Sequence, residues 1–422
     1  MKIAIGCWGS RGDVEPCVAV ASELVRRGHE VVIAVPPDQV RFAESAGVTA
    51  VAVGPGTAAI LDAHRDFWTC LFGAPWKIAR LAEARGKIAG PIINCWRDMD
   101  TTLRSLAADA DLLLTGVNFE DAAANVAEHF DIPLATVHYF PQRPNGAVIP
   151  ALPPAIGRAA VRAFWWMSWL GTKQVEASQR RELGLAPSTG SAAERITARG
   201  ALEIQAYDAA CFPGLADEWS EFGEQRSFVG TLTLQLSTDT DVEVMSWISE
   251  GTPPIFFGFG SMPVESPAET IAMIAAACAH LGERALIGAG WTDFGAAESY
   301  PHVKMVGAVN YARVFPLCRA LVHHGGSSTT PIGLRAGVPQ LILYWDLVHA
   351  IYGGAVKRLK LGTARRYSAV TQASLIADLS TILTPSYAER ARSLAPNITD
   401  HRESSRHAAD LVERAIQVGR SG

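Results

Sequence analysis

The sequence predicts an α/β protein with two doubly wound parallel sheets, each in its own domain. Short apolar, β-branched runs alternate with helical patterns in both halves of the chain, which is typical of parallel strands covered by helices on both faces. The chain has 422 residues, too many for one ordinary hydrophobic core. We expect the two domains to face each other across a cleft that holds the ligands.

Ten apolar runs are candidate strands. In the N-terminal half they lie within residues 2–8, 30–35, 49–54, 111–116 and 133–140. In the C-terminal half they lie within residues 254–260, 284–290, 303–308, 320–326 and 339–345. Helical patterns separate these runs, and after the last one we expect helix to the end of the chain.

A polar segment over residues 211–228 is rich in glycine and acidic residues and lacks a sustained hydrophobic period, as linkers do. The expected organisation therefore has four parts. They are an N-terminal Rossmann-like domain (1–212), a linker (213–230), a C-terminal Rossmann-like domain (231–400) and a C-terminal helix that crosses back to the N-terminal domain (401–422).

The composition argues against several classes of partner. The net charge is −5, so there is no basic field for nucleic acid. The seven cysteines are scattered and never spaced as CxxC, which favours a reducing cytoplasm over a disulfide framework or a zinc site. Neither a signal peptide nor a run of about 20 apolar residues is visible, so we expect a cytoplasmic protein. We also expect a monomer or a weak dimer.

The first turn, "GCWGSRGDVEP" at residues 6–16, combines glycines with acidic residues. Taken alone, the glycines could serve only close packing of helix on strand. A dinucleotide site fits less well, because the spacing is G-x-x-G-x-x-G and no acidic residue closes the second strand. Asp13 would be stabilised by the helix dipole even without a function.

The segment "HHGGSSTT" at residues 323–330 is more informative. It follows an apolar strand and presents backbone N–H groups and hydroxyls, which suit a diphosphate. Adjacent strand residues point to opposite faces, so only one of the two histidines should reach the ligand. A packed histidine at a strand end is the structural alternative.

Five segments carry a resemblance to a known family. They are, in order, "GSRGDVEP", "FGFGSM", "GAGWTDF", "VNYARVFPLCRALVHHGGSSTT" and "LRAGVPQ". Together they resemble the family 1 glycosyltransferases of GT-B fold, in the bacterial branch that modifies glycopeptide antibiotics, macrolides and sterols, and within it the actinobacterial glycopeptidolipid-type rhamnosyltransferases. The resemblance covers nearly the whole chain and is weakest over about 56–96 and 142–200. It implies an inverting, metal-independent transferase that needs no cofactor beyond a nucleotide sugar, with dTDP or UDP as the nucleotide.

The resemblance also implies that the N-terminal domain (1–212) binds the acceptor and the C-terminal domain (231–400) binds the donor. It further implies donor-binding positions. Trp291 matches the ring that stacks on the pyrimidine, with core packing as the alternative, and Val309 matches the backbone position that reads the base edge. The other matching positions surround the diphosphate: Ser10, Arg11, Ser261, His323, Gly326, Ser327, Ser328 and Thr329. Ser10 and Arg11 would reach in from the N-terminal domain, where a guanidinium offsets the charge of the leaving diphosphate.

Asp13 matches the general base of the family. An inverting transfer needs a carboxylate on the acceptor side of the anomeric carbon to take the hydroxyl proton. A carboxylate with a pKa of about 3.9 is a weak base towards an alcohol. Proton transfer is therefore expected late, coupled to cleavage of the bond to the diphosphate.

One pair of residues departs from the family pattern. Where the family has Asp-Gln to hold sugar hydroxyls, a gapless match places Val348 and His349, and Asp346 lies two residues earlier. Losing this anchor favours a donor with fewer hydroxyls, such as a 6-deoxyhexose like rhamnose. A UDP-glucose-dependent glucosyltransferase of secondary metabolism remains the alternative.

The aromatic cluster "RAFWWMSWLGTK" at residues 162–173 has basic residues on both sides. Three interpretations are possible. The cluster could pack in the core, line a hydrophobic acceptor site, or contact a membrane surface peripherally. We place Trp165 and Trp169 on the acceptor side, together with His138. The acceptor would be a glycolipid, a lipopeptide or another hydrophobic natural product.

Three short motifs, "DMD", "DAD" and "DTD", imitate a metal site but lie on helical or linker segments, so we assign no metal. An NAD-dependent oxidoreductase is disfavoured by the missing ribose acid. A nucleotide-sugar or lipid binding protein without activity is the non-catalytic alternative, and the presence of Asp13 and His323 argues against it.

Overall fold

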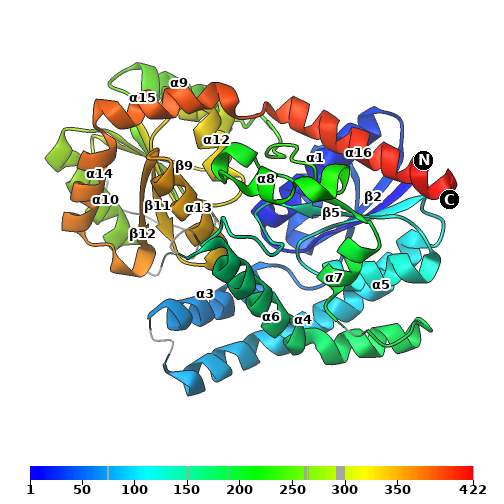
Figure 1. Cartoon of the computed structure of the whole chain (residues 1–422). Coiled ribbons are helices and arrows are strands. Elements are labelled where there is room, and N and C mark those ends of the chain that lie inside the picture. Colours follow the sequence, from blue (N-terminus) through cyan, green and yellow to red (C-terminus); the bar gives the residue numbers. More distant parts are fainter. Residues whose placement is uncertain are drawn as a thin grey trace. The chain divides into compact units, whose positions relative to one another are not determined.

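The computed structural model describes residues 1–421 except 74–75, 150–151, 189, 261–263, 265 and 291–299. By internal contacts the chain groups into two compact units. The first unit is Met1–Ile60, Arg85–Leu234 and Thr399–Gly422, and the second is Leu61–Ala84 and Gln235–Ile398. Each unit is built on a six-stranded sheet (Figure 1).

The sheet of the first unit is parallel throughout and has the order β3-β2-β1-β4-β5-β6. Its strands are β1 (Lys2–Gly6), β2 (Glu30–Val35), β3 (Thr49–Ala52), β4 (Leu112–Gly116), β5 (Leu134–His138) and β6 (Leu202–Gln205). The first five strands match apolar runs in the sequence. Strand β6 was not predicted, because the buried polar residues Glu203 and Gln205 interrupt its apolar pattern.

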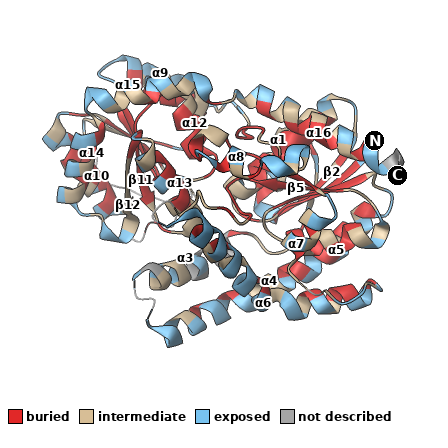
Figure 2. Ribbon diagram, in the orientation of Figure 1, coloured by how far each residue is buried: buried red, intermediate tan, exposed pale blue. Residues whose placement is uncertain are grey.

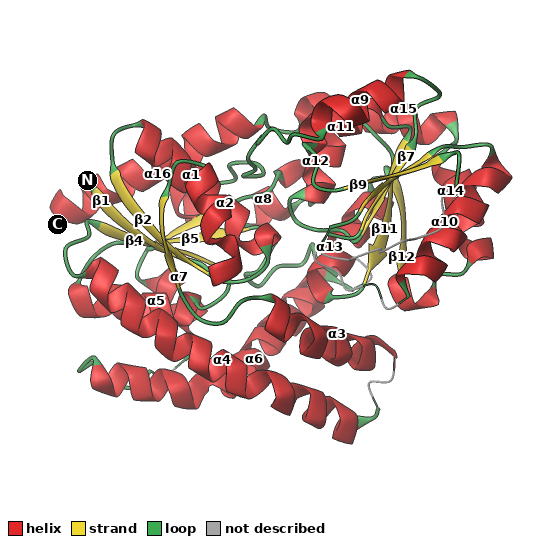
Figure 3. Cartoon of the chain, turned by 180° about the vertical axis from the view of Figure 1, so that it is seen from behind, coloured by secondary structure: helices red, strands yellow, loops and turns green. Residues whose placement is uncertain are grey.

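Helices cover both faces of this sheet (Figure 3). They are α1 (Arg11–Arg26), α2 (Val40–Ser45), α4 (Ile78–Ala107), α5 (Glu120–Phe130), α6 (Pro154–Glu182), α7 (Ala192–Ala198), α8 (Leu215–Glu218) and α16 (His401–Ser421). Alternate strand residues point to opposite faces. Ile3 and Ile5 therefore pack with α1 and α16, whereas Ala4 packs with α4, α5 and α7.

Helix α16 lies alongside α1 (Figure 1). Its buried residues Leu411, Val412 and Ile416 share the core of the first unit. The Arg27 guanidinium binds Asp410 at 2.6 Å and Glu413 at 2.9 Å. The last helix is thus an integral part of the first unit.

The sheet of the second unit is also parallel, with the order β12-β11-β10-β7-β8-β9. Its strands are β7 (Ile255–Gly258), β8 (Ala285–Gly288), β9 (Val303–Val306), β10 (Ala320–His323), β11 (Gln340–Tyr344) and β12 (Gly362–Arg366). The expectation of helix to the end of the chain was wrong at β12. This strand, "GTARR", lies at the sheet edge and has no apolar run.

The helices of the second unit again form two layers. They are α3 (Ala58–Gly73, which enters this unit at Leu61), α9 (Asp241–Ser249), α10 (Pro267–Leu281), α11 (Tyr311–Val314), α12 (Thr329–Arg335), α13 (Leu347–Arg358), α14 (Gln372–Ile382) and α15 (Pro385–Leu394). Helices α10 and α14 pack on Phe257 and its face of the sheet, and α9, α11 and α12 pack on Phe256 and the opposite face.

Both sheets have the same doubly wound order, and the order in which strands are added reverses between β1 and β4 and between β7 and β10. The predicted fold class, two doubly wound parallel sheets, is confirmed. The central strands of both sheets are buried, and α6 carries exposed residues along its length (Figure 2). Among the described residues, no helix is long and apolar enough to cross a membrane.

Candidate functional site

In doubly wound folds, ligands bind beyond the carboxyl ends of the strands, where the strand order reverses. In the first unit this point lies between β1 and β4. The turn after β1 leads into α1 at Arg11, with Ser10 as its N-cap. Gly9 has a φ of 138°, and a Cβ there would collide with the Asp13 carboxylate, so glycine is required for the turn to approach Asp13.

Asp13 is half-buried in the first turn of α1 and is held by several donors. Its Oδ2 accepts hydrogen bonds from the Ser10 backbone N–H at 2.7 Å and the Ser10 hydroxyl at 2.9 Å. Its Oδ1 accepts a hydrogen bond from the Tyr139 hydroxyl. Donors to a carboxylate stabilise its charged form, so this geometry holds an oriented, ionised carboxylate.

Arg11 is exposed and contacts Phe42 and Glu15. Its guanidinium lies 4.5 Å from the Phe42 ring centroid, and its Nε is 3.5 Å from Glu15 Oε2. The Glu15 carboxylate also accepts a hydrogen bond from the Leu234 N–H at 2.9 Å. In this structure Arg11 therefore rests on Phe42, and its predicted contact with a diphosphate stays a prediction.

His138 lies at the end of β5 inside a buried polar network. Its Nε2 is 3.2 Å from Glu120 Oε2. The Arg143 guanidinium binds Glu120 at 2.7 Å and Glu203 at 2.9 Å. Burial and the Arg143 charge lower the pKa of His138, and the Arg143 charge contributes to lowering the pKa of Glu120 to about 2, against the opposing effect of its burial. His138 is fully buried. In this structure its side chain therefore packs inside the first unit and helps to fix the end of β5.

The two tryptophans predicted for the acceptor side have different surroundings. Trp169 is buried and donates its Nε1–H to Glu176 at 2.7 Å. Trp165 is only partly buried, with its ring centroid 6.3 Å from that of Phe140. Phe140 follows Tyr139, whose hydroxyl donates a hydrogen bond to Asp13. Trp165, but not Trp169, therefore belongs to an aromatic series that leads to the carboxylate.

In the second unit the strand order reverses between β7 and β10, and His323 ends β10. Its Nε2 is 2.7 Å from Gln340 Oε1, and its Nδ1 accepts the Gly325 N–H at 3.1 Å. These contacts require the neutral tautomer with the proton on Nε2. Burial lowers the pKa of His323 to about 3. Both ring nitrogens thus hold the loop "HHGGSSTT" in place.

His324 lies on the other side of the strand, beside the end of β7. A Cβ on Gly260 would lie 2.5 Å from its ring, and one on Gly326 would lie 2.6 Å from its Nε2. His324 is buried, and its Nδ1 has no hydrogen-bond partner among the described residues. Of the two adjacent histidines, His324 is therefore the one with a free ring nitrogen at the switch point.

The loop hydroxyls are also buried. Ser327, Ser328 and Thr329 have exposed fractions of 5%, 8% and 9%. Within the described part of the chain, the Ser328 and Thr330 hydroxyls find no partner. Buried polar atoms without partners are costly, so these hydroxyls and His324 Nδ1 are suited to binding a polar ligand.

Asp346 caps α13, and its Oδ1 accepts the His349 N–H at 2.9 Å. Burial raises the pKa of Asp346 to about 6. Val348 and His349 follow in the first turn of the helix, and the His349 ring centroid lies 4.7 Å from that of His324. The structure thus places His349 next to the loop and uses Asp346 as a helix cap.

The remaining predicted positions divide into two groups. Val309 packs in the core of the second unit, and the next residue, Asn310, caps α11. Ser261 and Trp291 lie outside the described residues. Within the described chain, no group of three His, Cys, Asp or Glu side chains could hold a metal ion.

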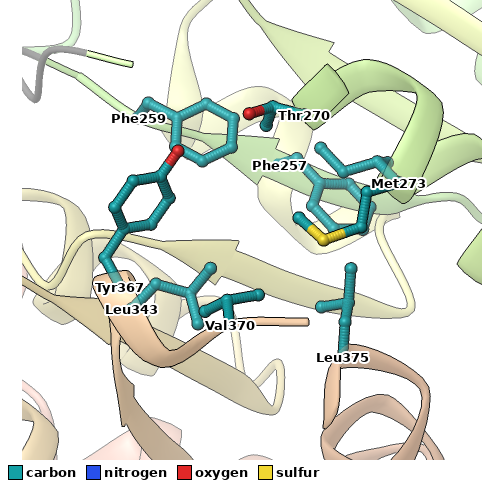
Figure 4. Close-up of a pocket in the computed structure, with 9 residues that line it drawn as sticks. Phe257, Phe259, Thr270, Met273, Leu343, Tyr367, Val370 and Leu375 are labelled. Atoms are coloured by element: carbon teal, nitrogen blue, oxygen red, sulfur yellow. The ribbon is translucent and has the colours of Figure 1, made fainter. Parts of the chain in front are cut away.

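An apolar pocket lies on the face of the second sheet that carries Phe257 (Figure 4). Phe257, Met273 and Tyr367 are among its lining residues. The free space is only about 10 Å³, roughly room for one water molecule. The pocket is a packing gap and is too small for a sugar.

Sequence reasoning missed Tyr139 and assigned no role to His324. Both come directly after an observed strand, β5 and β10 respectively. Polar residues at the carboxyl ends of strands near a switch point are the signal that could have identified them. Only the folded chain shows that Tyr139 reaches Asp13, which is distant in the sequence.

Two family models match the chain. The model of the "Glycosyltransferase family 28 N-terminal domain" matches residues 3–90, and that of the "Erythromycin biosynthesis protein CIII-like, C-terminal domain" matches residues 295–414. An uncharacterized glycosyltransferase of Mycobacterium leprae is 52% identical over 413 residues, which are 98% of this chain and 96% of the relative.

Solved structures share the fold at low sequence identity. The calicheamicin glycosyltransferase CalG4 matches with a TM-score of 0.67 at 19% identity, over 99% of this chain and 98% of CalG4. The spinosyn rhamnosyltransferase SpnG, solved with thymidine diphosphate, matches with a TM-score of 0.65 at 17% identity, over 98% of this chain and 99% of SpnG. The chain therefore belongs to the glycosyltransferases, and its two doubly wound sheets are those of the GT-B fold.

Proposed function

We propose that the protein transfers a hexose, with inversion, from a nucleoside diphosphate sugar to a hydroxyl of a hydrophobic acceptor. The observation that carries this proposal is the Asp13 carboxylate, held by Ser10 and Tyr139 beyond the end of β1. In the reaction, the acceptor oxygen forms a bond to the anomeric carbon as the bond from that carbon to the diphosphate breaks. Asp13 takes the acceptor proton, and the leaving diphosphate keeps the bonding electron pair.

The donor diphosphate is proposed to bind the loop after β10. Support comes from the buried Ser328 hydroxyl and His324 Nδ1, which lack partners among the described residues. A neutral imidazole and hydroxyls can donate hydrogen bonds to phosphate oxygens. The pKa of His324 is lowered to about 3 by burial and by His349, against the opposing effect of a hydrogen bond to the Gly258 backbone, so His324 is neutral. SpnG binds thymidine diphosphate, and we propose dTDP or UDP here.

We propose a 6-deoxyhexose such as rhamnose as the sugar, because Val348 and His349 replace a carboxylate and an amide. The position of Asp346 supports this: its Oδ1 already accepts the His349 N–H. A site without that anchor loses little when a sugar hydroxyl is missing. The assignment to the rhamnosyltransferases of glycopeptidolipid type rests on the resemblance alone.

The acceptor is proposed to be a glycolipid, a lipopeptide or another hydrophobic natural product. The series from Tyr139 through Phe140 to Trp165 supports this, because aromatic rings offer large apolar surfaces. The exposed side chains of Trp166, Met167 and Leu170 continue the apolar surface along α6.

Helix α6 also supports a peripheral membrane contact. Trp166 and Met167 are 52% and 56% exposed, and no acidic residue occurs between Asp131 and Glu176. Arg162 and Lys173 are exposed on the same helix. Exposed aromatic residues beside basic ones suit a surface of anionic lipid.

The proposed function is tested by release of the nucleoside diphosphate. The wild-type protein is incubated with dTDP-rhamnose or UDP-glucose and a detergent-dispersed lipid extract, and free dTDP or UDP is measured. Asp13→Asn should lower the rate by about 10²–10⁴-fold, because the general base is lost. Asp109→Asn, an exposed carboxylate paired with Lys2, is the matched control and should retain the wild-type rate.

Three other outcomes would change the proposal. Full activity of Asp13→Asn would exclude Asp13 as the base. A much higher rate with UDP-glucose would exclude the 6-deoxyhexose. Binding of both donors without any release would favour the non-catalytic alternative.

A further inference from the structure

The Tyr139 phenol is buried at the end of β5 and donates its hydroxyl proton to Asp13 Oδ1. It approaches from a different strand than the one that carries Asp13 into the site, since β4 lies between β1 and β5. The other carboxylate oxygen, Oδ2, is held by the Ser10 N–H and hydroxyl. The Asp13 carboxylate therefore accepts hydrogen bonds on both oxygens, from the N-cap residue Ser10 on one and from Tyr139 on the other.

The segment that carries Tyr139 is itself fixed. His138, the preceding residue, lies in the buried network of Glu120 and Arg143. The Tyr139 ring packs 5.6 Å from that of Phe140. A buried ion network with satisfied hydrogen bonds is rigid, so the phenol has little freedom to leave Asp13.

We propose that Tyr139 is a positioning residue for the glycosyl transfer, which orients the Asp13 carboxylate towards the acceptor hydroxyl. This inference rests on the proposed role of Asp13 as the general base. Tyr139 keeps its own proton throughout. The acceptor proton goes to Asp13, and Tyr139 fixes the direction from which the carboxylate receives it.

Physical chemistry predicts two effects of this contact. A hydrogen bond to a carboxylate favours its charged form, so losing the phenol should raise the pKa of Asp13. Losing the contact also frees the carboxylate to rotate, and a misplaced general base lowers the rate even when it is more basic.

Other titratable and charged groups lie near Asp13. The Cys7 thiol is buried, and burial raises its pKa well above its ordinary value, so it stays neutral. Its neighbour Cys17 lies on α1. Arg11 and Glu15, also on α1, pair with each other.

The contact can be measured without turnover. In protein labelled with ¹³C at the aspartate carboxyl carbons, the Asp13 resonance is assigned by its loss in Asp13→Asn. Tyr139→Phe, which keeps the ring, should shift this resonance. Tyr207→Phe is the matched control, because Tyr207 is also buried and donates its hydroxyl to a side chain, that of Gln205. An Asp13 resonance that is the same in Tyr139→Phe and wild type would overturn the inference.

The kinetic test uses the release assay with dTDP-rhamnose or UDP-glucose and the lipid extract, between pH 4.5 and 8. Tyr139→Phe should lower kcat by about tenfold or more with the donor KM unchanged, and should move the acidic limb of the rate profile to higher pH. Replacing Tyr139 with 3-fluorotyrosine, a stronger donor, should restore kcat and return the limb to its wild-type position or below. A purely structural role of the ring would leave the limb unmoved.

The outcomes separate this inference from the proposed function. Loss of activity in Asp13→Asn with a wild-type profile in Tyr139→Phe would refute the positioning role alone. Full activity in Asp13→Asn would refute the proposed base, and the positioning role with it. An equal loss in Tyr207→Phe and Tyr139→Phe would show that the effect is one of general stability.

Discussion

His323 is a buried histidine held in one tautomer. Its Nε2–H donates to Gln340, and its Nδ1 accepts the Gly325 N–H. A second ring proton, on Nδ1, would point at the Gly325 N–H. Protonation of His323 would therefore remove this hydrogen bond and destabilise the loop at residues 323–330. This contact favours a structural role for His323, and we therefore propose His324 as the histidine that binds the donor.

This arrangement predicts a loss of stability in acid. The pKa of His323 is about 3 in the folded protein and about 6.5 when unfolded. The unfolded chain therefore binds the proton more readily below pH 6.5, and the stabilising effect is lost as the pH falls from 6.5 towards 3. His323 should cost about 1.4 kcal/mol per pH unit in that range, measured by urea unfolding at pH 7 and pH 5.

Comparison with His323→Gln isolates this effect. The buried His324 and His349 act in the same direction, since their pKa values are also lowered. Asp346 acts in the opposite direction, because its pKa is raised. The variant should be less stable at pH 7 but should lose less stability on acidification. An identical pH dependence in both proteins would contradict the neutral tautomer.

Helix α6 has two apolar sides. Gly157, Val161 and Trp169 face the first unit and are buried, whereas Trp166 and Met167 are largely exposed. A helix that packs only against its own domain would carry polar residues on the outer side. The outer side of α6 therefore supports an external apolar contact.

We expect the protein to sediment with vesicles that contain anionic phosphatidylglycerol more than with pure phosphatidylcholine. Trp166→Ser together with Met167→Ser should weaken binding by about tenfold or more, because two large apolar side chains no longer enter the interface. Gln174→Ser, an exposed polar change on the same helix, is the control. Equal sedimentation of all three proteins, or none at all, would restrict α6 to packing and acceptor binding.

At the scale of the whole molecule, each sheet contributes one chemical half of the proposed reaction. The first unit holds the Asp13 carboxylate, and the second holds the loop with His324 and Ser328. A carboxylate repels an anionic diphosphate, so placing the two groups on separate sheets reduces this repulsion. A nucleotide alone should therefore bind through the second unit.

Binding of dTDP or UDP should stabilise the protein, by about 2.7 kcal/mol at a ligand concentration of one hundred times Kd. This is measured as a rise in Tm. His324→Gln should lower the affinity and reduce the rise. His280→Gln, an exposed histidine of α10, is the matched control and should behave as wild type. An unchanged rise in His324→Gln would exclude His324 from the donor site.

The sequence by itself determined the fold class and most strands, because hydrophobic periodicity is a local property that survives without knowledge of the partners. Strands β6 and β12 were not predicted, because β6 carries buried polar residues and β12 is a polar strand at the sheet edge. Asp13 and the loop "HHGGSSTT" were visible as short motifs for the same local reason.

Only the tertiary structure decided which side chains meet. The contact of Tyr139 with Asp13 joins residues 126 positions apart, and the network of Glu120, Arg143 and Glu203 joins three segments. Strand alternation required the two adjacent histidines to point to opposite faces, but the packing of Gln340 and Gly260 decided which face each one takes. Such contacts depend on strand order and register, which no local pattern encodes.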